Sequence, residues 1–157
     1  YENTNTAKSL LLALKSIDPN NNIIWLNGDV VFDKEIIKFL IKSSQSSMLV
    51  NSSVVGEEEV KYNINKDGTI KSVSKTVRNG LGEAVGLNRI NSNDFRKFKS
   101  CLEKCSNDDY FEKALEMLIN QESKIYPIDI SEYFCCEIDT QEDLNLVNEY
   151  LKEDIND

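Results

Sequence analysis

Apolar residues recur at helical spacing near the start of the chain. They fall at three- and four-residue intervals between Ala7 and Leu14 and stop before Asp18-Pro19. This pattern predicts a helix over residues 6–17. The run that follows, residues 22–27, is continuous, apolar and rich in β-forming residues. Such a run is typical of a strand that is buried on both faces of a sheet.

The pattern then returns to a helical period. Asp33 is suited to cap a helix that carries apolar residues from Ile36 to Ile41, and residues 46–50 are apolar enough for another strand. A strand, a helix and a second strand in this order predict a parallel crossover unit.

An alternating segment interrupts this order. Residues 60–64 and 70–74 alternate between polar and apolar side chains, and Lys66-Asp67-Gly68 between them has the composition of a turn. The segment therefore predicts an antiparallel hairpin inserted between parallel elements.

The remaining elements follow from the same periodicities. We expect strands over residues 84–90, 125–130 and 133–138, and helices over residues 93–105, capped by Ser92 or Asn93, and 110–120. Thr140 and Asp143 have the spacing of a capping box, which predicts the start of a last helix.

Together these elements predict one α/β domain over residues 1–157. We expect a mainly parallel, Rossmann-like sheet flanked by helices, with the antiparallel hairpin inserted in it. A domain of this length buries roughly 70% of the surface that its unfolded chain exposes, which allows a real core. The longest apolar runs are far too short to span a bilayer, so no membrane partner is expected.

Charge narrows the range of partners. The chain has 27 acidic and 18 basic residues, a net charge of -9, whereas phosphate backbones are bound by clustered Lys and Arg. We therefore expect no nucleic acid as a partner. A small phosphorylated ligand stays compatible with this charge, because a divalent cation held by carboxylates can supply the positive charge that such a ligand needs.

Two residue types bear on the chemistry and the compartment. Four cysteines occur without a CxxC pair or a secretory leader, and Cys135 and Cys136 are adjacent. This favours reduced thiols in the cytoplasm over disulfides or structural zinc. There is no histidine, so metal binding would fall to oxygen ligands, which favour hard cations and, beside phosphates, Mg²⁺.

Acidic residues follow two of the predicted strands. Asn27-Gly28-Asp29 ends the first, and Glu137-Ile138-Asp139 ends the last. Ligands of open α/β sheets bind outside the carboxyl ends of the strands, so these carboxylates could converge on one cation. The same positions also suit structural roles, because Asp29 could close a turn and Asp139 could complement a helix dipole. Spacing alone leaves both interpretations open.

A series of short motifs, in order, resembles the sugar-phosphate nucleotidylyltransferases. Within that family it is most similar to the phosphocholine cytidylyltransferases and their phosphonate-directed relatives. The resemblance runs from about residue 3 to residue 150 and rests on the segments Asn5 to Leu10, Leu26 to Phe32, Glu59-Val60-Lys61, Ile70 to Lys75, Gly82-Glu83 with Gly86-Leu87, Tyr110-Phe111-Glu112, and Glu137 to Thr140 with Glu142-Asp143-Leu144.

The resemblance implies a reaction and a set of roles. A phosphate oxygen of the acceptor would attack the α-phosphorus of a nucleoside triphosphate, CTP in these relatives, and pyrophosphate would leave. It implies that Asp29 and Asp139 bind Mg²⁺ with Glu137 beside them, and that Asp29 and Lys75 serve catalysis. The implied substrate contacts are Asn27, Lys61, Lys75, Glu83 and Glu112.

Simpler explanations exist for several of these positions. Either lysine could be an ordinary solvated residue of a hairpin, and Glu112 could be an ordinary exposed helix position. The acidic run of Glu57, Glu58 and Glu59 is expected on a solvated edge. Aromatic residues such as Tyr110 most often pack in a core, although their faces would also suit an ammonium head group.

The chain also departs from the family. A strand with a Gly-rich loop and a Pro-Lys pair, which hold the nucleotide in the family, do not occur in these residues. The fold would then be an incomplete nucleotide-diphospho-sugar transferase fold, with little activity alone and an open sheet edge that invites a second copy. Two alternatives stay open: a glycosyltransferase of the same architecture, although Asp29-Val30-Val31 lacks a second acid, and a non-catalytic binding or assembly module.

Overall fold

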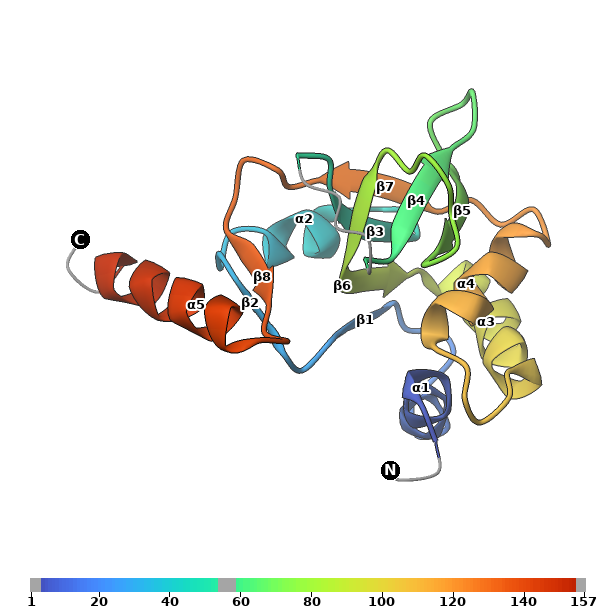
Figure 1. Ribbon diagram of the computed structural model, residues 1–157. Helices are drawn as coiled ribbons and strands as arrows, with labels where there is room; N and C mark the ends of the chain where they lie inside the picture. The colour runs from blue at the N-terminus through green and yellow to red at the C-terminus, as the bar shows by residue number, and fades with distance from the viewer. Residues whose placement is uncertain (1–3, 54–58, 155–157) are drawn as a thin grey trace.

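The computed structural model describes residues 4–53 and 59–154, and Figure 1 shows their arrangement. The helices are α1 (Thr6–Leu14), α2 (Ile37–Lys42), α3 (Ser92–Lys104), α4 (Phe111–Ile119) and α5 (Gln141–Asp154). The strands are β1 (Ile23–Leu26), β2 (Val30–Phe32), β3 (Ser47–Asn51), β4 (Lys61–Ile64), β5 (Ile70–Ser74), β6 (Gly82–Ile90), β7 (Tyr126–Asp129) and β8 (Cys135–Glu137).

Six of these strands form the main sheet. Its order is β5-β4-β6-β3-β7, and β1 also pairs with β6. Strands β3 and β7 are parallel, whereas β6 is antiparallel to β1, β3 and β4. The α/β class and the inserted β4–β5 hairpin are thus confirmed.

Most strands of the main sheet run in the same direction, as expected, but most neighbouring strands are antiparallel. Strands β1, β3, β4 and β7 run the same way, but β6 lies between β3 and β1 and runs against both. The crossover from β1 through α2 to β3 therefore joins two parallel strands that are not neighbours.

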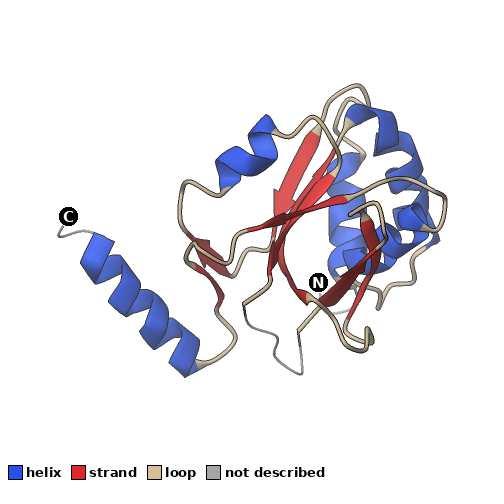
Figure 2. Cartoon of the chain, turned by 90° about the horizontal axis from the view of Figure 1, so that it is seen from above, coloured by secondary structure: helices blue, strands red, loops and turns tan. Residues whose placement is uncertain are grey.

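Helices cover both faces of the sheet (Figure 2). On one face, buried residues of α1, α3 and α4 share a core with Met48 and Val50 of β3; on the other, Leu40 of α2 shares a core with Leu49. Because successive side chains of a strand point to opposite faces, β3 contributes to both cores and is buried over Ser47–Val50. This accounts for its continuous apolar run.

Strand β1 differs from its prediction. We expected burial on both faces, but Leu26 is 46% exposed and only Ile23 is fully buried. Among the described strands β1 has one partner, β6. Its carboxyl end consequently lies at the margin of the sheet, where the candidate site begins.

Local caps set the helix ends. Asn91, rather than Ser92 or Asn93, caps α3, with its side chain accepting from Asn93 N and Asp94 N. Asp33 does not cap α2 as predicted, because the N-cap position is Ile36, which makes no side-chain cap bond. The Asp33 carboxylate instead accepts from Glu35 N at 3.2 Å in the turn before the helix. The predicted capping box of Thr140 and Asp143 is confirmed.

In that box, Thr140 N donates to Asp143 Oδ2 at 2.8 Å and Asp143 N donates to Thr140 Oγ1 at 3.2 Å. These reciprocal bonds start α5 at Gln141, four residues after Glu137.

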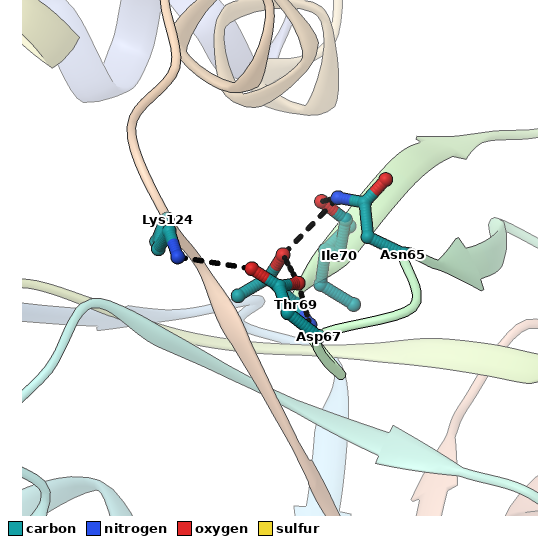
Figure 3. A network of polar contacts seen from close by, with 5 residues as sticks. All are labelled: Asn65, Asp67, Thr69, Ile70 and Lys124. Carbon is teal, nitrogen blue, oxygen red and sulfur yellow. Dashed lines mark hydrogen bonds and ion pairs between the residues drawn. The ribbon is translucent and has the colours of Figure 1, made fainter.

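A polar network holds the hairpin turn (Figure 3). Asp67 accepts from Thr69 Oγ1 and, at 2.9 Å, from Lys124 Nζ, while Asn65 Nδ2 donates to Thr69 Oγ1 at 3.1 Å. These bonds, led by the Thr69 hydroxyl, lower the pKa of the Asp67 carboxyl. The network joins the β4–β5 turn to the segment that leads into β7.

A second, two-stranded sheet lies beside the main one. Strand β2, which the sequence did not predict, pairs antiparallel with β8, and α5 extends away from this ribbon (Figure 1). The stacked rings of Phe134 and Tyr150, 3.8 Å between centroids, attach α5 to the ribbon. None of the helices in the described part of the chain has the length and apolarity needed to cross a bilayer.

Candidate functional site

The site begins where the main sheet meets the ribbon. Asp29 lies between β1 and β2, and its carbonyl oxygen accepts from Ile138 N at 2.9 Å. Val30 is opposite Glu137 in the β2–β8 register. The acidic segments therefore meet through the ribbon, not as adjacent strand ends of one sheet as the sequence had suggested.

This pairing gathers three carboxylates. One oxygen from each of Asp29, Glu137 and Asp139 lies within 4.8 Å of the other two. Asp29 and Asp139 are exposed and Glu137 is half-buried. An all-oxygen, anionic set of this spacing suits a hard divalent cation that keeps part of its water shell, so these residues fit Mg²⁺.

Without a bound cation the three carboxylates would repel one another. Burial, followed by the charges of Asp29 and Asp139, raises the pKa of Glu137. Asn27 opposes this effect, because its Nδ2 donates to Glu137 Oε1 at 3.4 Å. Bringing like charges together in this way costs stability unless a cation or a proton compensates.

A cavity of about 350 Å³ opens beside the triad. It is lined by the three acids together with Thr6, Asn27, Gly28, Glu59, Val60, Lys75, Ala84, Tyr110, Phe111 and Glu112. The cavity thus brings residues from the start, the middle and the end of the chain to one place.

Glu112 is the most deeply buried of the acids around this cavity. It lies in the first turn of α4, and its Oε2 is buried without a hydrogen-bond partner among the described residues. Burial raises its pKa to about 7, opposed by a hydrogen bond from the backbone N–H of Glu112 itself; smaller effects come from Glu137, which raises the pKa, and Lys75, which lowers it. A buried carboxylate oxygen without a partner is positioned to receive a donor or a cation from a ligand.

Lys75 and Tyr110 face each other at the same cavity. The Lys75 Nζ lies 6.0 Å from the centroid of the Tyr110 ring, and both residues are exposed. The cavity therefore presents one cation and one aromatic face near the acids. Both are groups that a charged substrate can use.

A second cavity, of about 280 Å³, shares Glu59, Ala84, Glu137 and Asp139 with the first. Glu83 lines it from β6, and burial, with the charges of Glu59 and Glu137, raises its pKa to about 7. Cys135 and Cys136 also line it, and all four cysteines of the chain are free thiols.

Lys61 is placed differently from the other predicted site residues. It starts β4, opposite Glu83 in the register, and is not among the residues that line either cavity. The structure thus brings together Asn27, Asp29, Lys75, Glu112, Glu137 and Asp139 at the first cavity. Glu83 faces the second cavity.

Two polar residues of the first cavity, Thr6 and Glu59, were not identified as site residues from the sequence. Glu59 was assigned to a solvated acidic run, yet it lines both cavities; Glu57 and Glu58 lie outside the described residues. Thr6 lines the first cavity and its hydroxyl accepts from Phe111 N at 3.1 Å. The sequence around a threonine at a helix start does not indicate whether its side chain bonds to another helix or lines a cavity.

Comparison of sequences finds no matching family model and no matching curated protein. Comparison of structures does find relatives of the fold. The inositol-1-phosphate CTP transferase of T. maritima superposes with a TM-score of 0.72 at 17% identity, over 90% of this chain and 58% of that one. The CTP:phosphocholine cytidylyltransferase of Streptococcus pneumoniae superposes with a TM-score of 0.75 at 18% identity, over 96% and 65%.

A third similar structure, from Bacillus anthracis, is assigned as a glucose-1-phosphate thymidylyltransferase; it has a TM-score of 0.71 at 15% identity, over 96% of this chain and 62% of that one. The chain therefore has the fold of nucleotidyltransferases and spans 58 to 65% of the length of these three proteins.

Proposed function

We propose that this chain supplies the metal-binding and acceptor-binding part of a Mg²⁺-dependent nucleotidyltransferase. The observation that carries the proposal is the convergence of Asp29, Glu137 and Asp139 at a cavity that Lys75 and Glu112 also line. The shared fold with nucleotidyltransferases supports it. Because the chain spans only part of those proteins, the activity of the whole protein belongs to the proposal.

The reaction needs alignment more than proton transfer. A phosphate or phosphonate oxygen of the acceptor, already an anion near neutral pH, attacks the α-phosphorus of a nucleoside triphosphate. The bond from that phosphorus to the bridging oxygen breaks, and pyrophosphate leaves. A site without histidine suits this chemistry, because no general base is required.

The proposal assigns a role to the metal ligands, to two lysines and to Asn27. Asp29, Glu137 and Asp139 hold Mg²⁺, which would offset negative charge on the phosphate oxygens. Lys75 contacts a phosphate group, and Lys61 supplies a further cationic contact from β4. Asn27 lies beside the metal site, where it would contact a substrate.

The acceptor is proposed to carry a cationic head group. The unpartnered Oε2 of Glu112 and the ring of Tyr110 at the same cavity would receive an ammonium group, and Glu83 would add a second carboxylate. Choline phosphate or an aminoethylphosphonate has this chemistry. CTP is proposed as the nucleotide, since two of the similar structures use CTP by name.

The cysteines and the free edge of β1 bear on the compartment and the assembly of the protein. Four free thiols suit a reducing cytoplasm. The edge of β1 that does not face β6 has no partner among the described strands, so it could pair with a second copy.

Pyrophosphate release tests the proposal. The natural protein, with any segments that accompany these residues, is incubated with Mg²⁺, each of the four common nucleoside triphosphates and a panel of phosphorylated acceptors. Release that requires both CTP and a cationic phospho-acceptor supports it. Transfer of a sugar from a nucleotide sugar without pyrophosphate would instead identify a glycosyltransferase, and binding without turnover would identify a non-catalytic module.

A further inference from the structure

Strand β6 has an irregular backbone beside the site. The β3–β6 register shifts between the pairs Met48–Asn88 and Val50–Ala84, which leaves extra β6 residues around Gly86. Gly86 is buried and has a φ of +75°, a conformation that side chains other than glycine rarely adopt. A bulge of this kind re-aims the groups next to it.

Asn27 packs directly onto this glycine. Its backbone N–H donates to the Gly86 carbonyl at 3.1 Å, which extends the β1–β6 pairing by one residue. A Cβ atom at position 86 would lie 2.8 Å from Asn27 Nδ2 and 3.2 Å from Asn27 Cβ. The whole short side chain, not only its tip, would have to move to admit a methyl group.

The other side of the Asn27 amide faces the metal site. Its Nδ2 donates to Glu137 Oε1 at 3.4 Å, near the upper limit for a hydrogen bond. A displacement of Asn27 by a few tenths of an ångström would therefore break this contact. The amide thus donates to a carboxylate that Asp29 and Asp139 repel.

We propose that Gly86 and Asn27 are positioning residues for the Glu137 carboxylate. The absent Cβ of Gly86 leaves room for the Asn27 amide, and the amide holds Glu137 in place beside Asp29 and Asp139. The inference rests on the proposed metal site and gives Asn27 a role that precedes any contact with a substrate. Hydrogen-bonded partners of metal ligands orient those ligands in this way in many proteins.

Mn²⁺ affinity, measured from the EPR signal of free Mn²⁺, tests the inference on the chain itself. Asn27→Ala and Gly86→Ala should each weaken Mn²⁺ binding by about tenfold. The double variant should bind no more weakly than Asn27→Ala, because a methyl group at position 86 then has no amide to displace.

Gly68→Ala is the matched control for backbone strain. Gly68 has a φ of +82° in the hairpin turn, but nothing lies within 4 Å of a Cβ built there. Gly68→Ala should cost stability and leave Mn²⁺ affinity unchanged. Thermal unfolding of every variant confirms that it is folded, and if Gly86→Ala fails to fold, Asn27→Ala still decides whether the amide matters.

The outcomes separate the two claims. If wild type binds Mn²⁺ and Asn27→Ala binds it within twofold of wild type, the positioning role is wrong while the metal site stands. If the double variant is weaker than Asn27→Ala by the full Gly86→Ala factor, Gly86 does not act through Asn27. If wild type binds no Mn²⁺, the metal site itself is wrong, and the positioning role with it.

Discussion

The backbone N–H of Ile138 donates to the carbonyl oxygen of Asp29 at 2.9 Å, across 109 positions of the chain (138 − 29). This bond continues the β2–β8 pairing by one step beyond Val30 and Glu137. It brings the side chain of Asp29 next to those of Glu137 and Asp139. The acidic triad therefore depends on a ribbon of two three-residue strands.

Removal of one triad charge should change the response of the protein to Mg²⁺. Wild type should unfold at a higher temperature when MgCl₂ is added, because a ligand that binds only the folded state stabilises it. Asp29→Asn should lose this response and should be slightly more stable than wild type without Mg²⁺, since repulsion of Glu137 is relieved. Thermal unfolding with and without MgCl₂ measures both effects.

Glu132→Gln is the control for that experiment, because Glu132 is an exposed acid outside the triad. It should respond to Mg²⁺ as wild type does. An equal rise in unfolding temperature for Asp29→Asn and wild type would show that Mg²⁺ binds elsewhere.

Glu112 should make the stability depend on pH. Its folded pKa of about 7 lies above the ordinary 4.5, chiefly because of burial, so the folded protein holds this proton more tightly than the unfolded chain. The carboxyl group costs nothing below pH 4.5, costs more as pH rises towards 7, and reaches its full cost above 7. Glu112→Gln should therefore gain up to about 3 kcal/mol at pH 8 and nothing at pH 4.

Urea unfolding at the two pH values measures this difference. Glu116→Gln removes an acid from the same helix, where Glu116 pairs with Lys113 at 3.7 Å, and serves as the matched control. A gain for Glu112→Gln that is the same at pH 4 and pH 8 would contradict the account, because it could not come from ionisation.

The packing of Trp25 against Phe98 should hold β1 on the helical layer. The two rings stack with centroids 5.1 Å apart, and Phe98 is fully buried. Phe98→Ala should cost about 3 to 5 kcal/mol of the free energy of unfolding. It should also shift the emission of Trp25, the one tryptophan in the chain, to longer wavelength.

Leu12→Ala tests whether that cost reflects burial, since Leu12 is 63% exposed on α1. We expect a change within about 0.5 kcal/mol for this surface position. A small loss for Phe98→Ala with unchanged Trp25 emission would show that the ring pair does not carry the contact between β1 and α3.

The Asp67 network should protect the hairpin turn from local opening. Asp67→Asn weakens the bonds to Thr69 and Lys124, so the amide hydrogen of Ile70, which bonds to Ile125 O at 2.8 Å, should exchange faster with solvent. Hydrogen exchange followed by NMR measures this rate. As a control, Glu35→Gln disrupts an exposed ion pair of similar kind with Lys38 and should leave the Ile70 exchange rate unchanged. Equal exchange rates in Asp67→Asn and wild type would contradict the protective role of the Asp67 network.

Helices and strands were predicted well from the sequence where the apolar periodicity extended over many residues. The hairpin, the capping box of Thr140 and Asp143, and the helices of the core follow from it, because local chemistry decides them. Strand β2 was missed because three residues carry no readable period. The exposure of Leu26 was missed because it depends on which strands flank β1.

The site was predictable in its residues but not in its geometry. The sequence indicated the triad residues from their places at strand ends: Asp29, Glu137 and Asp139. They meet through the β2–β8 ribbon, a long-range pairing that no local pattern encodes. The same holds for Glu59, whose acidic run resembles a solvated edge, and for the buried Oε2 of Glu112, which depends on how α4 packs. The contact of Gly86 with Asn27 depends on the shifted register of β6.

The central claim is that Asp29, Glu137 and Asp139 together bind one divalent cation. A crystal of the protein soaked in MnCl₂, with diffraction data collected near the manganese absorption edge, tests it most directly. The account predicts one strong anomalous peak between the three carboxylates in wild type and none there in Asp29→Asn. A wild-type crystal without a peak at this place, or an Asp29→Asn crystal that keeps it, would contradict the claim.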